Sequence, residues 1–284
     1  MVSLCSTRGS PLSKTPHATG FRVVGPPGSL MSGIYPHLSR APIREAVLDI
    51  RVELPASFAL EQLAPFTDLL SASFPEVRPI HTISANFAIG DKAPEISSAP
   101  PRIVGHIHWT QDKSRAVQGR LDGFTVNHVN SYKDWESLRL QAQELWRLYA
   151  DVAHPVRVVR IALRYVNRLE LLADAPLERS LRTLPKINSA LPQHPTNHFM
   201  RLVLPFPESR QVVLTQATED VDLLGNGMHE AGNSVGLLLD LDAFVSRSFD
   251  PRSSDMWAEF EQLREIKNLC FFESLTPEAL ERYR

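Results

Sequence analysis

Residues 157–172, RVVRIALRYVNRLELL, decide the fold class, because they show the most regular alternation of apolar and charged residues in the chain. Successive side chains of a β-strand point to opposite faces of the sheet. One face of this stretch would carry Ile161, Leu163, Tyr165, Leu169 and Leu171. The other would carry Arg160, Arg164, Arg168 and Glu170. The stretch therefore predicts a long strand with one buried face and one arginine-rich face.

A second stretch, residues 42–54, alternates in the same way. Its charged face would carry Glu45, Asp49, Arg51 and Glu53. Without a gap, RVELPASFALE (51–61) aligns with RLELLADAPLE (168–178) at six identical positions of eleven. We interpret this match as an internal repeat of strand, helix, strands and helix, with halves 41–156 and 157–284 in one globular unit. A twofold pseudo-symmetry would make the two charged strands neighbours in one sheet.

The rest of the chain predicts further strands and three amphipathic helices. The helices are expected at 57–74, 131–153 and 254–269, and a weak one at 176–184. Strands are expected at 78–89, 103–110, 115–121, 124–129, 198–205, 211–218 and 233–244, with residues 90–102 as a loop. Asp122-Gly123 is a typical hairpin turn. This pattern predicts an α+β fold with an antiparallel sheet and helices packed on one face.

Residues 1–40 are rich in Ser, Pro and Gly and show no period, which predicts a disordered tail. An alternative interpretation is that the natural chain starts near Met31. The formal net charge is −2, which argues against a surface built wholly for nucleic acid. The two cysteines, Cys5 and Cys270, and the lack of a long apolar run favour a cytoplasmic protein without membrane contact.

No motif of an enzyme stands out in the sequence, so no catalytic residue and no cofactor are predicted. His106 and His108, in GHIHW, would point to the same face of a strand, a spacing that suits two metal ligands. They are weak metal candidates, because no spacing supplies a third ligand, and two ordinary histidines of a sheet explain them as well. His194 and His198, and the glycines at 225, 227 and 232, lack the context of a metal or phosphate site.

Four segments together resemble an uncharacterised, sporadically distributed prokaryotic family. They are APIREAVLDIRVEL (41–54), GRLDGFTVNHV (119–129), LRYVNRLEL (163–171) and KNLCFFESLTPEAL (267–280). The residues singled out by the resemblance are Pro42, Ile43, Glu45, Asp122, Gly123, Phe124, Arg164, Tyr165, Asn167, Arg168, Lys267, Asn268 and Phe272. The resemblance implies an architecture rather than an activity. Its patchy occurrence implies horizontal transfer, as for defence or toxin–antitoxin genes.

Glu45, Arg164, Asn167 and Arg168 are our candidate binding residues, because packing alone does not explain them. Arginines on a sheet face bind carboxylate or phosphate groups, although ion pairs on a solvated face explain them too. We therefore expect a non-enzymatic module that binds a protein partner through a charged sheet face. Two alternatives stay open: a hydrolase or nucleotide-processing enzyme that uses Glu45, arginines and the histidine pair, and a nucleic-acid binder that uses the open sheet.

Overall fold

The fold is described by a computed structural model for residues 35–82, 85–88, 95–98, 100–172, 175–193, 197–219 and 234–284. The strands are β1 (Ile43–Glu53), β2 (Glu76–Thr82), β3 (Ala85–Ala88), β4 (Glu95–Ser98), β5 (Arg102–Trp109), β6 (Arg115–Arg120), β7 (Gly123–Val129), β8 (Arg157–Leu172), β9 (Phe199–Pro205), β10 (Arg210–Thr218) and β11 (Ser234–Val245). The α-helices are α1 (Ala64–Leu70), α2 (Trp135–Ala153), α3 (Asp255–Ser274) and α4 (Pro277–Glu281). Two short 3-10 helices are η1 (Leu60–Leu63) and η2 (Leu177–Arg179).

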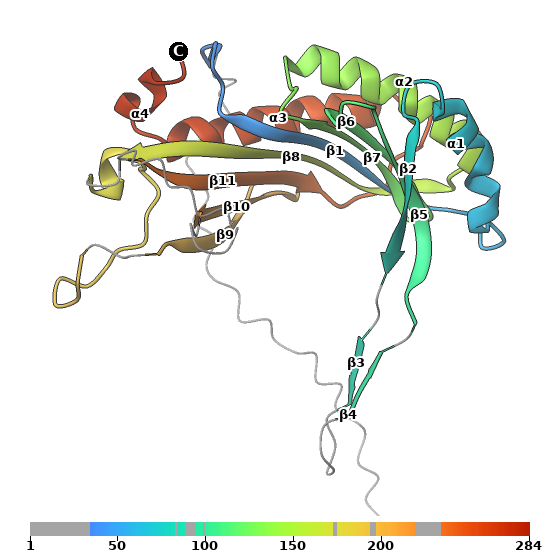
Figure 1. Ribbon diagram of the computed structural model, residues 1–284, viewed down its shortest axis with the longest axis horizontal. Coiled ribbons are helices and arrows are strands. Elements are labelled where there is room, and N and C mark those ends of the chain that lie inside the picture. Colours follow the sequence, from blue (N-terminus) through green and yellow to red (C-terminus); the bar gives the residue numbers. More distant parts are fainter. Residues whose placement is uncertain are drawn as a thin grey trace, which may run out of the picture.

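Within these residues, nine strands form one antiparallel sheet in the order β2-β5-β6-β7-β1-β8-β11-β10-β9. The α+β class with an antiparallel sheet is therefore confirmed. Figure 1 shows α2 and α3 against one side of this sheet, while β3 and β4 form a separate two-stranded ladder below it. Within the described ranges, no helix combines the length and the apolar character needed to cross a bilayer.

The two charged strands, β1 and β8, are neighbours at the centre of the sheet, as expected. Their antiparallel register pairs Val47 with Arg164 and Leu48 with Leu163. An irregularity at the start of β1 pairs Ile43 with Asn167 but Glu45 with Val166. Such a bulge inserts a residue and reverses the alternation. Ile43 therefore packs against the hydrophobic core, whereas Glu45 stays on the charged side of the sheet.

One hydrophobic core joins the sheet to the helices. Ala46, Leu48 and Ile50 of β1 are fully buried, as are Ile161 and Leu163 of β8. The residues that alternate with them along these strands point to the other face and are mostly polar. The alternation in sequence therefore decides which face is buried. Burying apolar area stabilises the fold by roughly 25 cal/mol per Å², which makes this layer the main source of stability.

Several predicted boundaries differ in the structure. The expected strand 78–89 divides into β2 and β3, and β4 lies inside the expected loop 90–102. A four-residue ladder with β3 satisfies the backbone of β4, a partner that local composition does not reveal. The expected helix 57–74 divides into η1 and α1, where Pro65 stands in the first turn and cannot donate a backbone hydrogen bond.

The two long helices also differ from prediction at their ends. Helix α2 begins after Asp134, whose carboxylate accepts a hydrogen bond from the Ser137 amide at 2.7 Å. Ser131, where the helix was expected to begin, instead donates to the Ser114 carbonyl at 2.7 Å, and Asp134 caps the helix. Helix α3 runs to Ser274, beyond the expected residue 269, and the weak helix at 176–184 is only η2.

Of the expected tail, residues 35–40 are placed against the folded body. Leu38 is buried in the core, and the Tyr35 ring stacks on Phe272 with centroids 4.7 Å apart. The amide of Arg40 donates to the Tyr283 carbonyl at 3.0 Å. Residues 1–34, which include Met31, lie outside the described residues.

Candidate functional site

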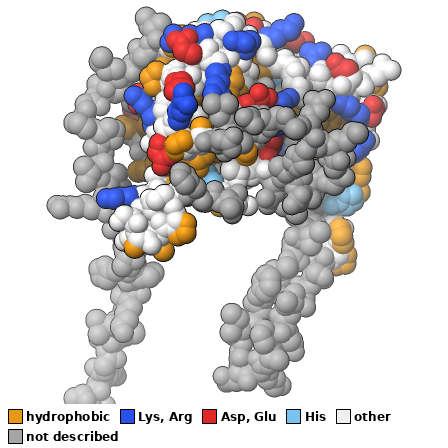
Figure 2. Space-filling view, turned by 60° about the vertical axis from the view of Figure 1, so that its left-hand side comes forward, with side chains coloured by type: hydrophobic (Ala, Val, Ile, Leu, Met, Phe, Trp, Pro, Cys, Tyr) orange, Lys and Arg blue, Asp and Glu red, His pale blue; other side chains and the backbone are white. Residues whose placement is uncertain are grey.

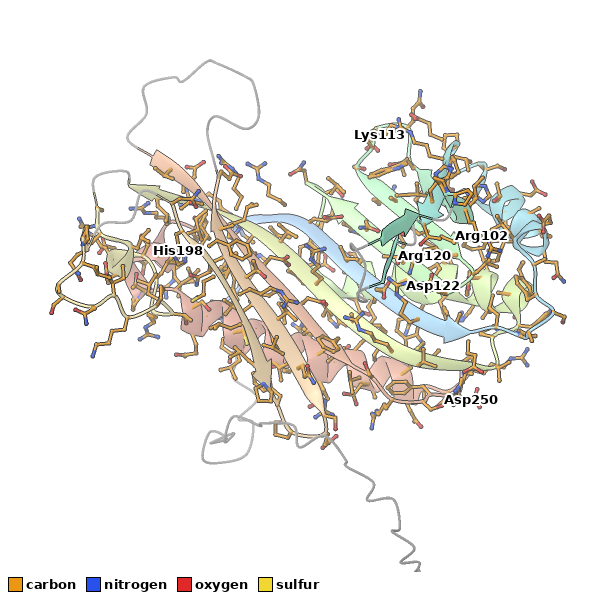
Figure 3. The ribbon with its side chains drawn as sticks, turned by 90° about the horizontal axis from the view of Figure 1, so that it is seen from below. Arg102, Lys113, Arg120, Asp122, His198 and Asp250 are labelled. Carbon is orange, nitrogen blue, oxygen red and sulfur yellow. The ribbon has the colours of Figure 1, made fainter. Side chains whose placement is uncertain are left out.

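The side of the sheet away from the core holds a hollow of about 540 Å³, which we call the polar hollow. It is lined by Glu45, Val47, Asp49, Arg51, Gln118, Arg120, Thr125, Asn127, Arg160, Ala162, Arg164 and Asp242. These side chains come from β1, β6, β7, β8 and β11, which lie side by side in the sheet. Figure 3 looks onto this side of the sheet, where Arg120 and Asp122 lie near its β6–β7 part and His198 lies at the far end.

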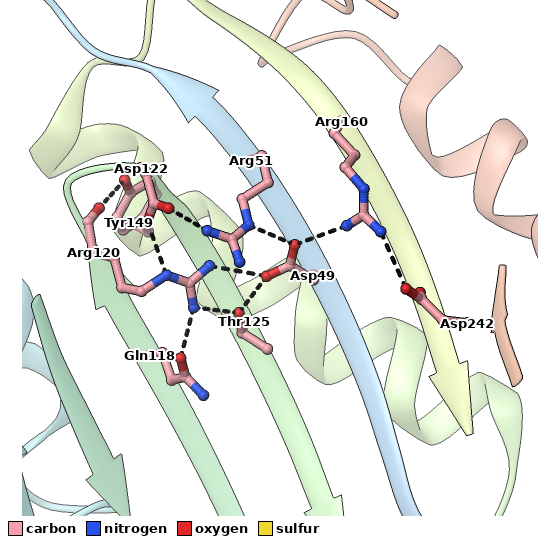
Figure 4. Close-up of polar contacts among 9 residues, drawn as sticks. All are labelled: Asp49, Arg51, Gln118, Arg120, Asp122, Thr125, Tyr149, Arg160 and Asp242. Atoms are coloured by element: carbon pink, nitrogen blue, oxygen red, sulfur yellow. Dashed lines mark hydrogen bonds and ion pairs between the residues drawn. The ribbon is translucent and has the colours of Figure 1, made fainter. Parts of the chain in front are cut away.

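Asp49 is the centre of a hydrogen-bonded network in the floor of the polar hollow (Figure 4). One of its oxygens accepts from Arg120 Nη2 at 2.9 Å and from the Thr125 hydroxyl at 2.7 Å. The other accepts from Arg51 Nε at 3.0 Å and lies 3.5 Å from Arg160 Nη1. One carboxylate therefore joins three arginines of three strands.

The network is sheltered from solvent, which makes its charges depend on one another. The side chain of Arg120 is 7% exposed and that of Asp49 is 13% exposed. Burial alone would raise the pKa of Asp49, but Arg120, Arg51 and the Thr125 hydrogen bond together lower it. Asp49 is thus a carboxylate at neutral pH, and Arg120 would be a buried charge without it.

Two further ion pairs connect β8 with β11 at the edge of the hollow. Arg164 donates twice to Asp240, from Nε at 2.8 Å and from Nη2 at 2.7 Å. Arg160 donates to Asp242 at 3.2 Å, and its guanidinium lies 4.4 Å from the centre of the Phe244 ring. Burial raises the pKa of Asp242 in spite of both nearby arginines. Every arginine in the polar hollow is therefore held by a carboxylate of the protein itself.

Glu45 and Asn127 leave one hydrogen-bonding group of the hollow unused. The amide nitrogen of Asn127 donates to Glu45 at 2.7 Å. The amide oxygen of Asn127 is buried and accepts no hydrogen bond from any described residue. An unpaired buried acceptor of this kind costs about 1–3 kcal/mol.

The four predicted binding residues do not form one site. Glu45 and Arg164 both line the polar hollow. Arg168 is outside it and donates from Nε to Glu219 at 2.9 Å. Asn167 is 2% exposed and donates to the Leu239 carbonyl at 3.0 Å. Asn167 therefore lies on the other side of the sheet from Arg164 and Arg168, because adjacent residues of a strand point to opposite faces.

The sequence interpretation missed Arg120 and Asp242 as residues of the hollow. Arg120 ends β6 and is brought to Asp49 by β7, which separates β6 from β1. The alternation of apolar and polar residues in 115–121 and 233–244 could have placed Arg120 and Asp242 on the polar face of the sheet. It was used only to predict the strands. Asp49 was recognised as part of a charged face but not as its centre.

The histidine pair has ordinary structural contacts. His108 is buried, its Nε2 lies 3.0 Å from the Thr67 hydroxyl and its Nδ1 lies 3.3 Å from the Val117 carbonyl. Burial lowers the pKa of His108. Within the described residues, no group of three His, Cys, Asp or Glu side chains is placed to hold a metal ion. His194 and the glycines at 225, 227 and 232 lie outside the described residues.

Most of the residues singled out by the family resemblance lie in two places. Glu45 and Arg164 line the polar hollow, and Asp122 pairs with Arg120 and Arg51 beside it. A second group lines a smaller hollow on the core side of the sheet: Pro42, Ile43, Tyr165, Asn167, Lys267, Asn268 and Phe272. We call this second site the lysine hollow.

Comparison with known proteins adds no relative. No family model matches the chain, and the curated proteins contain no significant match to it.

Proposed function

We propose that the chain is a non-enzymatic binding module that recognises a protein partner through the polar hollow. The observation that supports this role is the open hollow in which Arg120, Arg160 and Arg164 are each paired with a carboxylate. Fixed ion pairs present donors and acceptors in a set geometry, so a partner would meet a preorganised surface. The partner would supply polar groups to the rim.

The arrangement of charges favours a protein over a nucleic acid as the partner. Nucleic-acid binding depends on arginines and lysines that are free to neutralise phosphates and so release the counterions of the nucleic acid. In the polar hollow Arg120, Arg160 and Arg164 are each paired with a carboxylate. Positive and negative side chains are also interspersed on the face of the molecule that Figure 2 shows. A mixed surface of this kind suits a partner that carries both signs of charge.

The hydrolase alternative has less support in the same geometry. Its proposed carboxylate, Glu45, is engaged by Asn127, and its proposed Arg164 is engaged by Asp240. The ring nitrogens of His108 face Thr67 and Val117. A catalytic carboxylate or histidine would need a reacting group within hydrogen-bond reach.

A site-specific photocrosslink tests the proposal directly. A photoreactive phenylalanine analogue at Gln118, on the wall of the polar hollow, should form a crosslink to one protein in the native host. The matched control carries the analogue at Leu140, which is 53% exposed on α2. Mass spectrometry would identify the product, and a crosslink at Leu140 but not at Gln118 would refute the proposed surface.

A second measurement uses the partner so identified. Arg164→Ala should abolish its capture, because the variant frees Asp240 and changes the charge pattern of the rim. The Arg164 side chain is 47% exposed, so the free energy of unfolding should fall by only about 1 kcal/mol. Retained capture, or a large loss of stability, would mean that Arg164 only supports the sheet.

The finer architecture is part of the same proposal. We propose that 41–156 and 157–284 are two pseudo-repeats and that the helices cover one face of the whole sheet. The order of elements supports this, since each half starts with a central strand, β1 or β8, that pairs with the last strand of its own half, β7 or β11. We further propose a cytoplasmic location and a role in a horizontally transferred defence or toxin–antitoxin system, on the grounds of cysteine usage and the family resemblance.

A further inference from the structure

The lysine hollow is a separate cavity of about 260 Å³ on the core side of the sheet. It lies between the start of β1, the middle of β8, the loop before α2 and the side of α3. Aromatic rings form much of its wall: Tyr35, Tyr132, Tyr165, Phe271 and Phe272. Its volume suits a small molecule and is too little for a peptide chain.

Lys267 is the unusual group in this cavity. It is 8% exposed, and its ammonium nitrogen lies 3.7 Å from the centre of the Tyr165 ring. It donates one hydrogen bond to the side-chain oxygen of Asn268, at 2.7 Å. A lysine ammonium has three donors, and a buried one is normally paired with a carboxylate. No carboxylate of the described residues forms an ion pair with Lys267.

Of the other two cations that line the cavity, Lys133 is exposed to solvent and Arg264 already has partners. Arg264 lies 3.3 Å from a Glu265 oxygen and 3.8 Å from a Glu261 oxygen. The Tyr165 hydroxyl lies beside Tyr132 but makes no well-aligned hydrogen bond among the described residues. The cavity thus offers one uncompensated ammonium, one spare hydroxyl and several ring surfaces.

Burial, followed by the charge of Arg264, lowers the pKa of Lys267 to about 7. The charged or titratable groups around the cavity are Arg264 and Glu265 of α3, Tyr165 of β8, Lys133, Asp134 and Tyr132 before α2, and Tyr35 and His37 of the first segment. An anion beside Lys267 would favour its protonated form. Bound ligand and proton uptake should therefore be linked above neutral pH.

We propose that the lysine hollow binds a small planar monocarboxylate, whose carboxylate pairs with Lys267 and whose flat body lies against the aromatic wall. A single buried and uncompensated cation matches one negative charge, which favours a carboxylate over a dianionic phosphate. Ring surfaces match a flat apolar body. This inference is independent of the protein-binding role of the polar hollow, which lies on the other side of the sheet.

Calorimetric titration with three probes of similar shape tests the proposal. Benzoate should bind to the full-length protein at pH 6.5, and benzamide and phenyl phosphate should each bind at least about tenfold more weakly. Equal binding of benzamide would show that no charge is recognised. Tighter binding of phenyl phosphate, or no benzoate binding up to about 10 mM, would overturn the monocarboxylate assignment.

Two variants connect the result to the proposed residue. Lys267→Met should lose benzoate binding and keep the fold, because it replaces a buried amine with an apolar chain of similar length. Lys186→Met removes an exposed lysine and should change the affinity by less than about twofold. Unchanged binding by Lys267→Met would refute the assignment, and a melting curve of each variant checks that it folds.

Proton linkage provides a readout that an adventitious contact would not show. In buffers of different ionisation enthalpy, benzoate binding at pH 8 should take up close to one proton per molecule bound. At pH 6, where Lys267 already carries its proton, the uptake should approach zero. Equal uptake at both pH values would place the anion away from Lys267.

Discussion

At the scale of single residues, Asp49 has the largest expected influence on the polar hollow. Its carboxylate accepts hydrogen bonds from Arg120, Arg51 and Thr125. Asp49→Ala would leave Arg120, a side chain only 7% exposed, without its buried counter-charge. The free energy of unfolding should fall by about 3 kcal/mol, as measured by urea denaturation.

The control for this prediction is Asp122→Ala. Asp122 also pairs with Arg120, but its side chain is 60% exposed. Its loss should cost less than about 1 kcal/mol, because solvent screens the pair. Equal losses for the two variants would show that burial does not decide the strength of this network.

The same residue predicts a pH dependence. The pKa of Asp49 is lower in the folded protein than the ordinary value of 3.8 for an aspartate side chain. Its contribution is therefore complete above about pH 4 and is lost as the pH falls toward the folded-state pKa. Wild type and Asp49→Ala should differ most in stability near pH 6 and converge on acidification. Urea denaturation at pH 6 and pH 3 measures this, and a gap that widens at pH 3 would contradict it.

At the scale of elements, the turn between β6 and β7 depends on Gly123. Its φ is +156°, and a Cβ there would lie 2.3 Å from the Ile50 carbonyl oxygen of β1. Gly123→Ala should cost roughly 1–3 kcal/mol, because the backbone of the neighbouring strand would have to move. Thermal unfolding would show this.

Gly236→Ala is the matched control in β11. A Cβ at that position meets the end of the Glu219 side chain rather than backbone. Glu219 can rotate away, so the loss should stay below about 1 kcal/mol. A larger effect at Gly236 than at Gly123 would contradict the proposed role of close backbone approach.

Helix α3 is fastened to β10 by a buried ion pair. Arg210 and Glu259 are 5% and 4% exposed, and Arg247 also pairs with Glu259. Glu259→Ala should destabilise the protein by about 3–5 kcal/mol, because buried Arg210 would keep only Glu208, whose side chain is 65% exposed. Glu273→Ala removes a 65% exposed partner of Arg182 and should cost less than about 1 kcal/mol. Denaturant midpoints that match between the two variants would contradict this.

At the scale of the whole molecule, the pairing of β1 with β8 joins the two halves of the sheet. Ten residue pairs form this ladder, and Leu48 and Leu163 are buried within it. Fragments 1–154 and 155–284 should be insoluble or self-associated alone, because each exposes an unpaired central strand. Co-expressed fragments should co-purify as a one-to-one complex, as measured by size exclusion with light scattering.

Two substitutions make this test specific. Leu48→Asp in the first fragment should prevent assembly, since it places a charge in the shared core. Arg157→Ala, at a side chain 52% exposed, should leave assembly intact. Soluble, folded monomers of either fragment would instead show that the halves are independent domains.

The prediction from sequence succeeded where local pattern and tertiary structure agree. Strand β8 matches its predicted range, 157–172, and β1 with Ala46, Leu48 and Ile50 faces the core as expected. Of the predicted binding residues, Glu45 and Arg164 line the polar hollow and Asn167 does not, and their role in binding stays a prediction. Asn167 faces the lysine hollow, because successive residues of a strand point to opposite faces of the sheet.

The sequence by itself determined which face of β1 and of β8 is buried, and it determined the antiparallel α+β class. The reason is that the alternation of apolar and polar residues is a property of a few neighbouring residues in one segment. Only the tertiary structure decided which charges meet: Arg120 reaches Asp49 from two strands away, and Lys267 of α3 lies over Tyr165 of β8. Such contacts depend on the register and order of strands and on helix docking, and these are set by the packing of the whole core rather than by any local pattern.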